Sequence, residues 1–468
     1  MKTFALPRPV TDDDISAAEK LKRVEKLVDE LRDDFEHINL LPHERNAYME
    51  QLKVFGRNPD NADPIFTPQG IEILTHHSFH STSLTTSKAA LQCLANALLS
   101  KPPTRQMFVD LGYSERAVGR LRKPKKDDEF LMSRILFLTS YGTTQSFEKL
   151  IDKHRLADHI NDNIERHAKK KRPTSKDDEA LSETLKLLFN VTHFCPTRTN
   201  PFSKSISPIM KILSRRPVVT PPLLAPINFL INSLINMDFE DKSLINSNLK
   251  PCVEALISIL DVALRTYGDT ELDATVTPLL TLLKRLAKVS PPPVIAIMKA
   301  SMLPDPPKKG VISKDPALLH VRLMDYLANP RSTSLYDSIS SLFFELSGGD
   351  VSKLTGEFGL GFSSGFLMTR NMQIPAKNSS VRSSVASMSD ESTKSRSVDL
   401  TGRKPLPGLP KDRSSAAAKR RTKGQGEEKL MVLFDRLKMT DITNYDDPRM
   451  QAAAESMVVE LDSDDDGI

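Results

Sequence analysis

The feature that most constrains this chain is the helical spacing of its apolar residues. From about Ile15 to Arg370, apolar side chains recur at intervals of three and four residues, the spacing that places them on one face of an α-helix. None of these stretches shows the apolar–polar alternation of a half-buried strand. Aromatic residues make up only 6% and tryptophan is absent, which favours aliphatic packing between helices. The sequence therefore predicts an all-α fold.

Prolines and short polar segments divide this region into separate helices, because proline lacks a backbone donor and its ring clashes with the preceding turn. Breaks are expected at residues 101–104, 169–175, 216–217, 220–222, 290–293 and 303–310. We predict helices that begin near Ile15, Leu84, Glu129, Asp177, Leu223, Pro251, Glu271, Ala317 and Ser334. A chain of 468 residues is too long for one compact core, so we favour a stack of helical repeats over a large bundle.

The composition changes after residue 370. Residues 371–426 are rich in Ser, Lys, Arg, Gly and Pro and poor in apolar groups, which predicts a disordered basic linker. Residues 427–440 are expected to form a short amphipathic helix, and residues 441–468 an acidic, solvated tail. The apolar stripe of the short helix consists of Leu430, Leu433, Phe434 and Leu437. A helix this short is marginal by itself in water, so it needs a surface to bind.

Cysteine usage and hydropathy indicate a cytoplasmic protein. Cys93, Cys195 and Cys252 lie far apart and form no C-x-x-C pair, so neither a disulfide framework nor a thiolate zinc site is expected. The N-terminus lacks the sustained apolar stretch of a signal peptide, and no later segment offers the roughly 20 consecutive apolar residues of a membrane span. We also expect no cofactor, because no nucleophile, base and orienting group come together in a motif.

Six stretches resemble those of the synembryn family, in matching order along almost the whole chain. They include LQCLANALLS at 91–100, TLKLLFNVT at 184–192 and LMVLFDRLK at 430–438. The others lie at residues 134–140, 321–327 and 358–367. Several of these stretches are individually ordinary, and their common order carries the resemblance. The glycine-rich part of 358–367 matches imperfectly, and the acidic Ser/Thr cluster that often follows the repeats is reduced here to residues 387–391.

The resemblance implies an armadillo/HEAT-like superhelix that acts as a guanine-nucleotide exchange factor and folding chaperone for G-protein α subunits. Its concave face would receive the client's C-terminal helix, and the short helix at 427–440 would embrace the client's GTPase domain. Such a protein would be a monomer without covalent chemistry, would prefer nucleotide-free or nascent α subunits and would reach the plasma membrane only through its client. Exchange of this kind needs only differential affinity for two states of the client.

Candidate client-binding residues follow partly from the resemblance and partly from unusual side chains in apolar helices. They are Lys53, Arg57, Asn96, Lys186, Asn190 and Asn232, together with the apolar stripe of 427–440. Lys53 and Arg57 are one turn apart and are expected to share a helix face. Each asparagine is open to two interpretations, an amide that binds the client or an internal hydrogen bond. Arg134 and Arg322 lie in apolar helices and are equally interpretable as ion-pair partners.

Other residues carry weaker signals. His76, His77 and His80 include an i, i+4 pair, but no carboxylate or thiolate completes a metal site nearby. Gly359, Gly361 and Gly365 resemble a phosphate-binding loop only superficially, and a tight turn between helices is the preferred interpretation. Candidate phosphorylation sites, inferred from local charge, are Ser383, Ser387, Ser397 and Ser463.

Composition and periodicity alone would equally fit a generic α-solenoid adaptor, of the karyopherin or cytoskeletal kind. The detached amphipathic helix at 427–440 separates the two hypotheses, since exchange requires a second contact with the client and an adaptor has little use for one. We therefore prefer the exchange factor and keep the adaptor as the alternative.

Overall fold

The computed structural model describes residues 15–122, 124, 127–241, 246–304, 315–329, 332–358 and 367. Over these residues the chain is helical and contains no strand, and neighbouring helices pack in pairs. The prediction of an all-α fold built from stacked helices is therefore confirmed. In the same part of the chain, no helix combines the length and apolarity that a membrane crossing requires.

The α-helices are α1 (Ala17–His37), α2 (Pro42–Phe55), α3 (Pro68–His80), α4 (Leu84–Ser100), α5 (Pro103–Asp110), α6 (Ser114–Arg120), α7 (Asp128–Thr139), α8 (Phe147–His154), α9 (Leu156–Lys169), α10 (Ser175–Phe194), α11 (Ile206–Arg215), α12 (Ile227–Ile235), α13 (Asn246–Thr266), α14 (Asp269–Val289), α15 (Pro292–Met302), α16 (Leu319–Ala328), α17 (Thr333–Leu346) and α18 (Val351–Phe358). Short 3-10 helices lie at η2 (Asp63–Phe66), η3 (Pro196–Arg198) and η4 (Asn200–Ser205).

The polar and proline breaks act as helix starts. Helix α10 begins with a capping box, in which the Thr174 hydroxyl accepts the Asp177 N–H and the Asp177 carboxylate accepts the Thr174 N–H. Pro103 occupies the first turn of α5, where its missing donor would have no helical partner anyway. The predicted breaks at 101–102, 170–174, 290–291 and 303 separate consecutive helices as expected.

Two predicted helix starts differ from the structure by four or five residues. The helix expected from Leu223 begins at Ile227 instead, because Pro226 disfavours the helical conformation of the residue before it. The helix expected from Pro251 begins at Asn246 and continues through the proline, which costs one helical hydrogen bond. Leu249 and Cys252 are both buried beside this proline, and their packing keeps the helix continuous.

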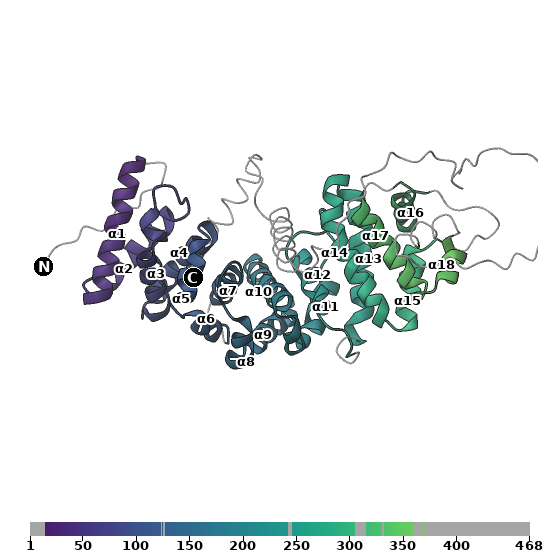
Figure 1. Cartoon of the computed structure of the whole chain (residues 1–468), viewed down its shortest axis with the longest axis horizontal. Coiled ribbons are helices and arrows are strands. Elements are labelled where there is room, and N and C mark those ends of the chain that lie inside the picture. Colours follow the sequence, from purple (N-terminus) through teal and green to yellow (C-terminus); the bar gives the residue numbers. More distant parts are fainter. Residues whose placement is uncertain are drawn as a thin grey trace, which may run out of the picture. The chain divides into compact units, whose positions relative to one another are not determined.

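The described residues fall into two compact units, and the division passes through α14 and α15, which are labelled in Figure 1. Unit 1 holds residues up to 267 together with 281–294, and unit 2 holds 268–280 and the described residues from 295 onward. In unit 1, helices α2, α4, α7, α10 and α12 each pack against the next and form one row. Helices α3, α5, α6, α9 and α11 form a second layer, each packed against a member of this row.

In unit 2, α17 packs against both α16 and α18. The rings of Phe343 and Phe358 stack with their centroids 4.9 Å apart, which joins α17 to α18. Leu323 and Ile339 are fully buried between α16 and α17. The proposed linker, the short helix 427–440, the acidic tail, the four candidate phosphorylation sites and the glycine segment 359–365 all lie outside the described residues.

Burial predicts the behaviour of the three thiols. Cys93, Cys195 and Cys252 are free and buried, and burial raises the pKa of Cys93 and Cys252 to about 12 and that of Cys195 to about 11. Because the thiolate is the reactive form, we expect negligible reaction of the native chain with an aromatic disulfide reagent near pH 8, and reaction of all three thiols in urea. Release of the coloured thiolate measures both. Rapid reaction of the native chain would contradict the burial of these side chains.

Candidate binding surface

Contacts between neighbouring helices fix the alignment of the row in unit 1. The Asn190 amide on α10 donates to the hydroxyl of Ser140, just after α7, at 2.7 Å. The Ser233 hydroxyl on α12 donates to the Leu185 carbonyl on α10 at 3.2 Å. Further along both helices, Asn236 donates to the Phe189 carbonyl at 3.1 Å, so α10 and α12 run in the same direction.

Helix α4 joins the row with the same alignment. Lys88 in α4 pairs with Asp127, which directly precedes α7, at 2.8 Å, so the two helices begin at the same edge. At 1.5 Å per residue, Asn96 on α4 lies about 12 Å beyond Lys88, and Phe137 on α7 lies about 15 Å beyond Asp127. These two side chains are therefore at similar heights on neighbouring helices.

The central stretches of α4, α7, α10 and α12 are buried almost all round. Within 89–98 of α4, 128–139 of α7, 181–192 of α10 and 227–234 of α12, only six residues are not buried. Row neighbours cover two sides of α4, α7 and α10 and one side of α12, and the second layer covers a further side of each helix. We infer that these six residues share the side that remains. We call them the open stripe, and they are Asn96, Arg134, Phe137, Lys186, Phe189 and Asn232.

The three candidate asparagines have different surroundings. Asn96 and Asn232 are half-buried on the open stripe, and among the described residues no hydrogen bond involves either side chain. Asn190 has an exposed fraction of 0% and its amide donates to Ser140. The internal hydrogen bond proposed as the alternative for all three is therefore present at Asn190.

Contrary to the prediction, Lys53 and Arg57 do not share a helix face. Helix α2 ends at Phe55, and the chain turns at Gly56, whose N–H donates to the Leu52 carbonyl. Arg57 is half-buried beyond the helix, whereas Lys53 is 5% exposed on α2 and its ammonium lies 2.6 Å from the Glu50 carboxylate. A spacing of four residues places two side chains on one face only within a helix, and α2 ends before it reaches Arg57.

A buried carboxylate holds the two cations of the open stripe. Glu183 on α10 lies 2.8 Å from Arg134 and 3.2 Å from Lys186. Burial opposes the charge of Glu183, but the two cations outweigh burial and lower its pKa to about 2. Arg134 also lies 4.3 Å from the centre of the Phe130 ring, and Lys186 lies 4.7 Å from that of Phe229. Both cations are thus held in place while a part of each side chain stays open.

The open stripe combines three kinds of contact. Its two amides each offer a donor and an acceptor, and its two cations suit an acidic or carboxylate group. Its two phenylalanines extend an aromatic cluster, since Phe137 lies 5.3 Å from Tyr141 and Phe189 stacks on His193 at 6.1 Å. A surface of this composition suits an amphipathic helix with a negatively charged end.

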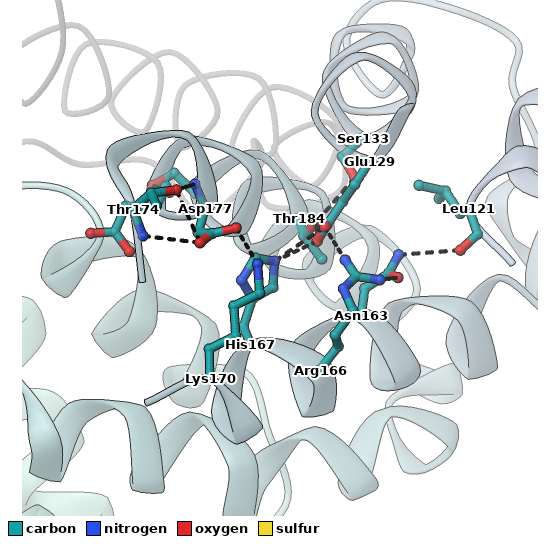
Figure 2. A network of polar contacts seen from close by, with 12 residues as sticks. Leu121, Glu129, Ser133, Asn163, Arg166, His167, Lys170, Thr174, Asp177 and Thr184 are labelled. Carbon is teal, nitrogen blue, oxygen red and sulfur yellow. Dashed lines mark hydrogen bonds and ion pairs between the residues drawn. The ribbon is translucent and has the colours of Figure 1, made fainter. Parts of the chain in front are cut away.

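A second polar cluster joins α7 and α10 of the row to α9 of the second layer. Glu129 on α7 is buried and accepts from His167 on α9 at 2.9 Å, from Thr184 on α10 at 2.9 Å, and from Arg166 (Figure 2). Burial disfavours the charged form of Glu129, but the hydrogen bond and charge of His167, together with Arg166 and Thr184, outweigh it and lower its pKa. Ser133 bonds to Thr184 at 3.2 Å, so one carboxylate connects three helices.

Sequence reasoning missed half of the open stripe. Arg134 is not among the predicted client contacts and was equally interpretable as an ion-pair partner, and the structure contains its pair with Glu183. Phe137 and Phe189 are apolar like the buried residues beside them, so the sequence does not indicate that these two positions stay open. The polar residues Asn96, Lys186 and Asn232 are the signal of the open side that the sequence offers.

The remaining candidates, His76, His80 and Arg322, contact other groups within the protein. His76 stacks on His80 at 4.9 Å, and burial lowers the pKa of His76 to about 4. In the described part of the chain, no group of three His, Cys, Asp or Glu side chains is placed to hold a metal ion. Arg322 donates to the carbonyls of Pro316 at 2.5 Å and Ala317 at 2.9 Å, just before α16.

Comparisons with known proteins identify one family. The family model for guanine nucleotide exchange factor synembryn matches residues 48–457. No curated protein matches the sequence. An engineered protein solved by a structural genomics consortium aligns over 76% of this chain and 92% of its own, at 13% identity and a TM-score of 0.44. A structure described by a phosphorylation switch between cadherin and β-catenin aligns over 76% and 99%, at 11% identity and a TM-score of 0.28. At these TM-scores neither structure defines the fold.

Proposed function

Because the chain belongs to the synembryn family of guanine-nucleotide exchange factors for G-protein α subunits, we propose that its open stripe binds the C-terminal helix of such a subunit. The observation that supports this most directly is the open stripe itself. Four helices that are buried almost all round leave amides, cations and phenylalanines on one common side. The family match also decides against a generic adaptor, the alternative that composition left open.

The physical mechanism requires no reacting group in this protein. The client's C-terminal helix leaves its own domain when it binds the open stripe, which weakens the nucleotide site of the client. Guanine nucleotide and exchange factor then stabilise opposing states of the α subunit, so each lowers the affinity of the other. The protein acts by binding, as a monomer in the cytoplasm, and the same contacts hold nascent α subunits during folding.

The six residues have distinct roles in this proposal. Asn96 and Asn232 hydrogen-bond to the client helix, because within the described residues neither amide has an internal hydrogen bond. Lys186 and Arg134 attract the carboxylate end of that helix, and Glu183 holds both cations in position. Asn190 and Lys53 act indirectly, by supporting the helices on which the contact residues stand.

A second contact is proposed for residues 427–440, whose sequence predicts an amphipathic helix that binds the client's GTPase domain. Truncation after Gly426 should leave the affinity for a peptide copying the client's C-terminal helix unchanged. It should lower the affinity for the whole nucleotide-free subunit at least about tenfold, because two linked contacts reinforce one another. Fluorescence anisotropy of the peptide and pull-down of the apo subunit measure the two. Equal pull-down by both chains would exclude the second contact.

A further inference from the structure

One edge of unit 1 gathers cations from two neighbouring connections. Helix α9 ends at Lys169 and α11 ends at Arg215, and the chain then passes to α10 and α12 of the row. The Arg215 guanidinium donates to the Ala168 carbonyl at 3.1 Å, and that of Arg216 donates to Asp178 at 2.7 Å. These contacts place the start of the connection 215–226 next to the connection 169–176, and we call the two connections together the basic edge.

Three acidic residues near the basic edge are already paired with cations, and a fourth, Glu179, accepts a hydrogen bond from the Ser175 hydroxyl. Asp177 forms an ion pair with Lys170 (Figure 2), and Asp178 forms one with Arg216. The Glu165 carboxylate lies 3.2 Å from the Lys169 ammonium. Four cations remain exposed with no carboxylate partner in the described part of the chain. They are Lys171, Arg172, Lys176 and Arg215. Within the described residues, the basic edge therefore carries a net positive charge that no carboxylate neutralises.

Exposed apolar side chains accompany these cations. Val218, Val219 and Leu224 are 37%, 54% and 52% exposed in the connection 215–226. Solvent contact with such side chains is unfavourable, and each would gain free energy by leaving water. No aromatic residue occurs in 169–176 or 215–226, so the basic edge lacks the rings on which nucleic-acid bases stack.

We propose that the basic edge docks on the surface of an anionic phospholipid bilayer. The unpaired cations attract the phosphate and carboxylate headgroups, and Val218, Val219 and Leu224 enter the boundary between headgroups and acyl chains. Because both connections belong to the same edge of unit 1, the two kinds of contact form on one surface. This inference does not rest on the proposed function, since it involves none of the residues of the open stripe.

Vesicle sedimentation of the full-length chain tests this inference, with phosphatidylcholine vesicles that contain or lack phosphatidylserine. The chain should bind only the anionic vesicles, and less at high salt. The variant Lys171→Glu/Arg172→Glu/Lys176→Glu should lose affinity by about a hundredfold, since each basic residue near the surface contributes about fivefold. The matched control is Lys22→Glu/Lys26→Glu/Lys153→Glu, with the same charge change at exposed lysines away from the basic edge. It should bind nearly as the parent chain does.

A second variant separates the apolar contribution from charge. Val219→Ser/Leu224→Ser should weaken vesicle binding by about tenfold while keeping its dependence on salt. The inference is overturned if the charge-reversed variant and the control bind vesicles equally, because the lipid contact would then lie elsewhere. It is also overturned if the charge-reversed variant loses binding of a labelled single-stranded RNA but keeps its vesicle binding, which would make the basic edge a nucleic-acid surface.

Discussion

A Glu129→Ala variant should lose about 3 kcal/mol of unfolding free energy. The substitution removes the acceptor shared by His167, Arg166 and Thr184, and it leaves the buried imidazole and hydroxyl without that partner. Because these groups come from α7, α9 and α10, the loss affects the packing of the row rather than one helix. Urea unfolding followed by circular dichroism at a helix wavelength measures it.

Glu165→Ala is the matched control, because Glu165 lies on α9 and forms an exposed pair with Lys169. An exposed pair contributes at most about 1 kcal/mol, so this variant should unfold nearly as the parent chain does. Equal destabilisation by both substitutions would contradict a special role of the buried carboxylate.

The same carboxylate predicts a dependence on pH. The pKa of Glu129 is lowered in the folded chain, so its stabilisation is fully present above the pKa of an unfolded glutamate and is lost as the pH falls below it. Stability of the parent chain should therefore decline below about pH 4.5, and Glu129→Ala should show a shallower decline. Parallel pH profiles for the two chains would show that Glu129 keeps an ordinary pKa.

An Asn96→Ala/Asn232→Ala variant should bind a peptide copying the client's C-terminal helix about a hundredfold more weakly. Each substitution removes one or two hydrogen bonds to the client, worth about tenfold in affinity per side chain. The melting temperature should stay nearly unchanged, because in the described part of the chain neither amide has an internal hydrogen bond. Anisotropy with a labelled client peptide and thermal unfolding test the two halves of this expectation.

Asn190→Ala provides the contrast within the same row. It removes a buried hydrogen bond to Ser140 and should cost about 1 to 3 kcal/mol of stability. Its effect on peptide affinity should be smaller than that of the double variant, because its side chain has no exposed surface. If the double variant melts early and binds normally, the open stripe is not the client surface.

The sequence predicted the helices well because apolar spacing and proline act locally. Prolines at 102 and 291 end one helix and begin the next, and the capping box at Thr174 is readable from neighbouring residues. The failures also have local causes. Pro226 moved the start of α12, and the turn at Gly56 ended α2 before Arg57.

Tertiary placement was not readable from one sequence. Asn96, Asn190 and Asn232 appear alike, as single amides in apolar helices. Among the described residues only Asn190 has a hydrogen-bond partner, and that partner lies fifty positions away. Glu129 and His167 are separated by 38 residues, and no spacing rule pairs them. The resemblance predicted the family, and the family match over residues 48–457 confirmed it.

The most direct test of the central proposal is the rate of GDP release from a purified G-protein α subunit, measured with and without the full-length chain. We expect release to accelerate in proportion to the chain's concentration until it saturates, and a stable complex to form that added GTP dissociates. Unchanged GDP release, together with no complex in the absence of nucleotide, would contradict the proposed exchange function.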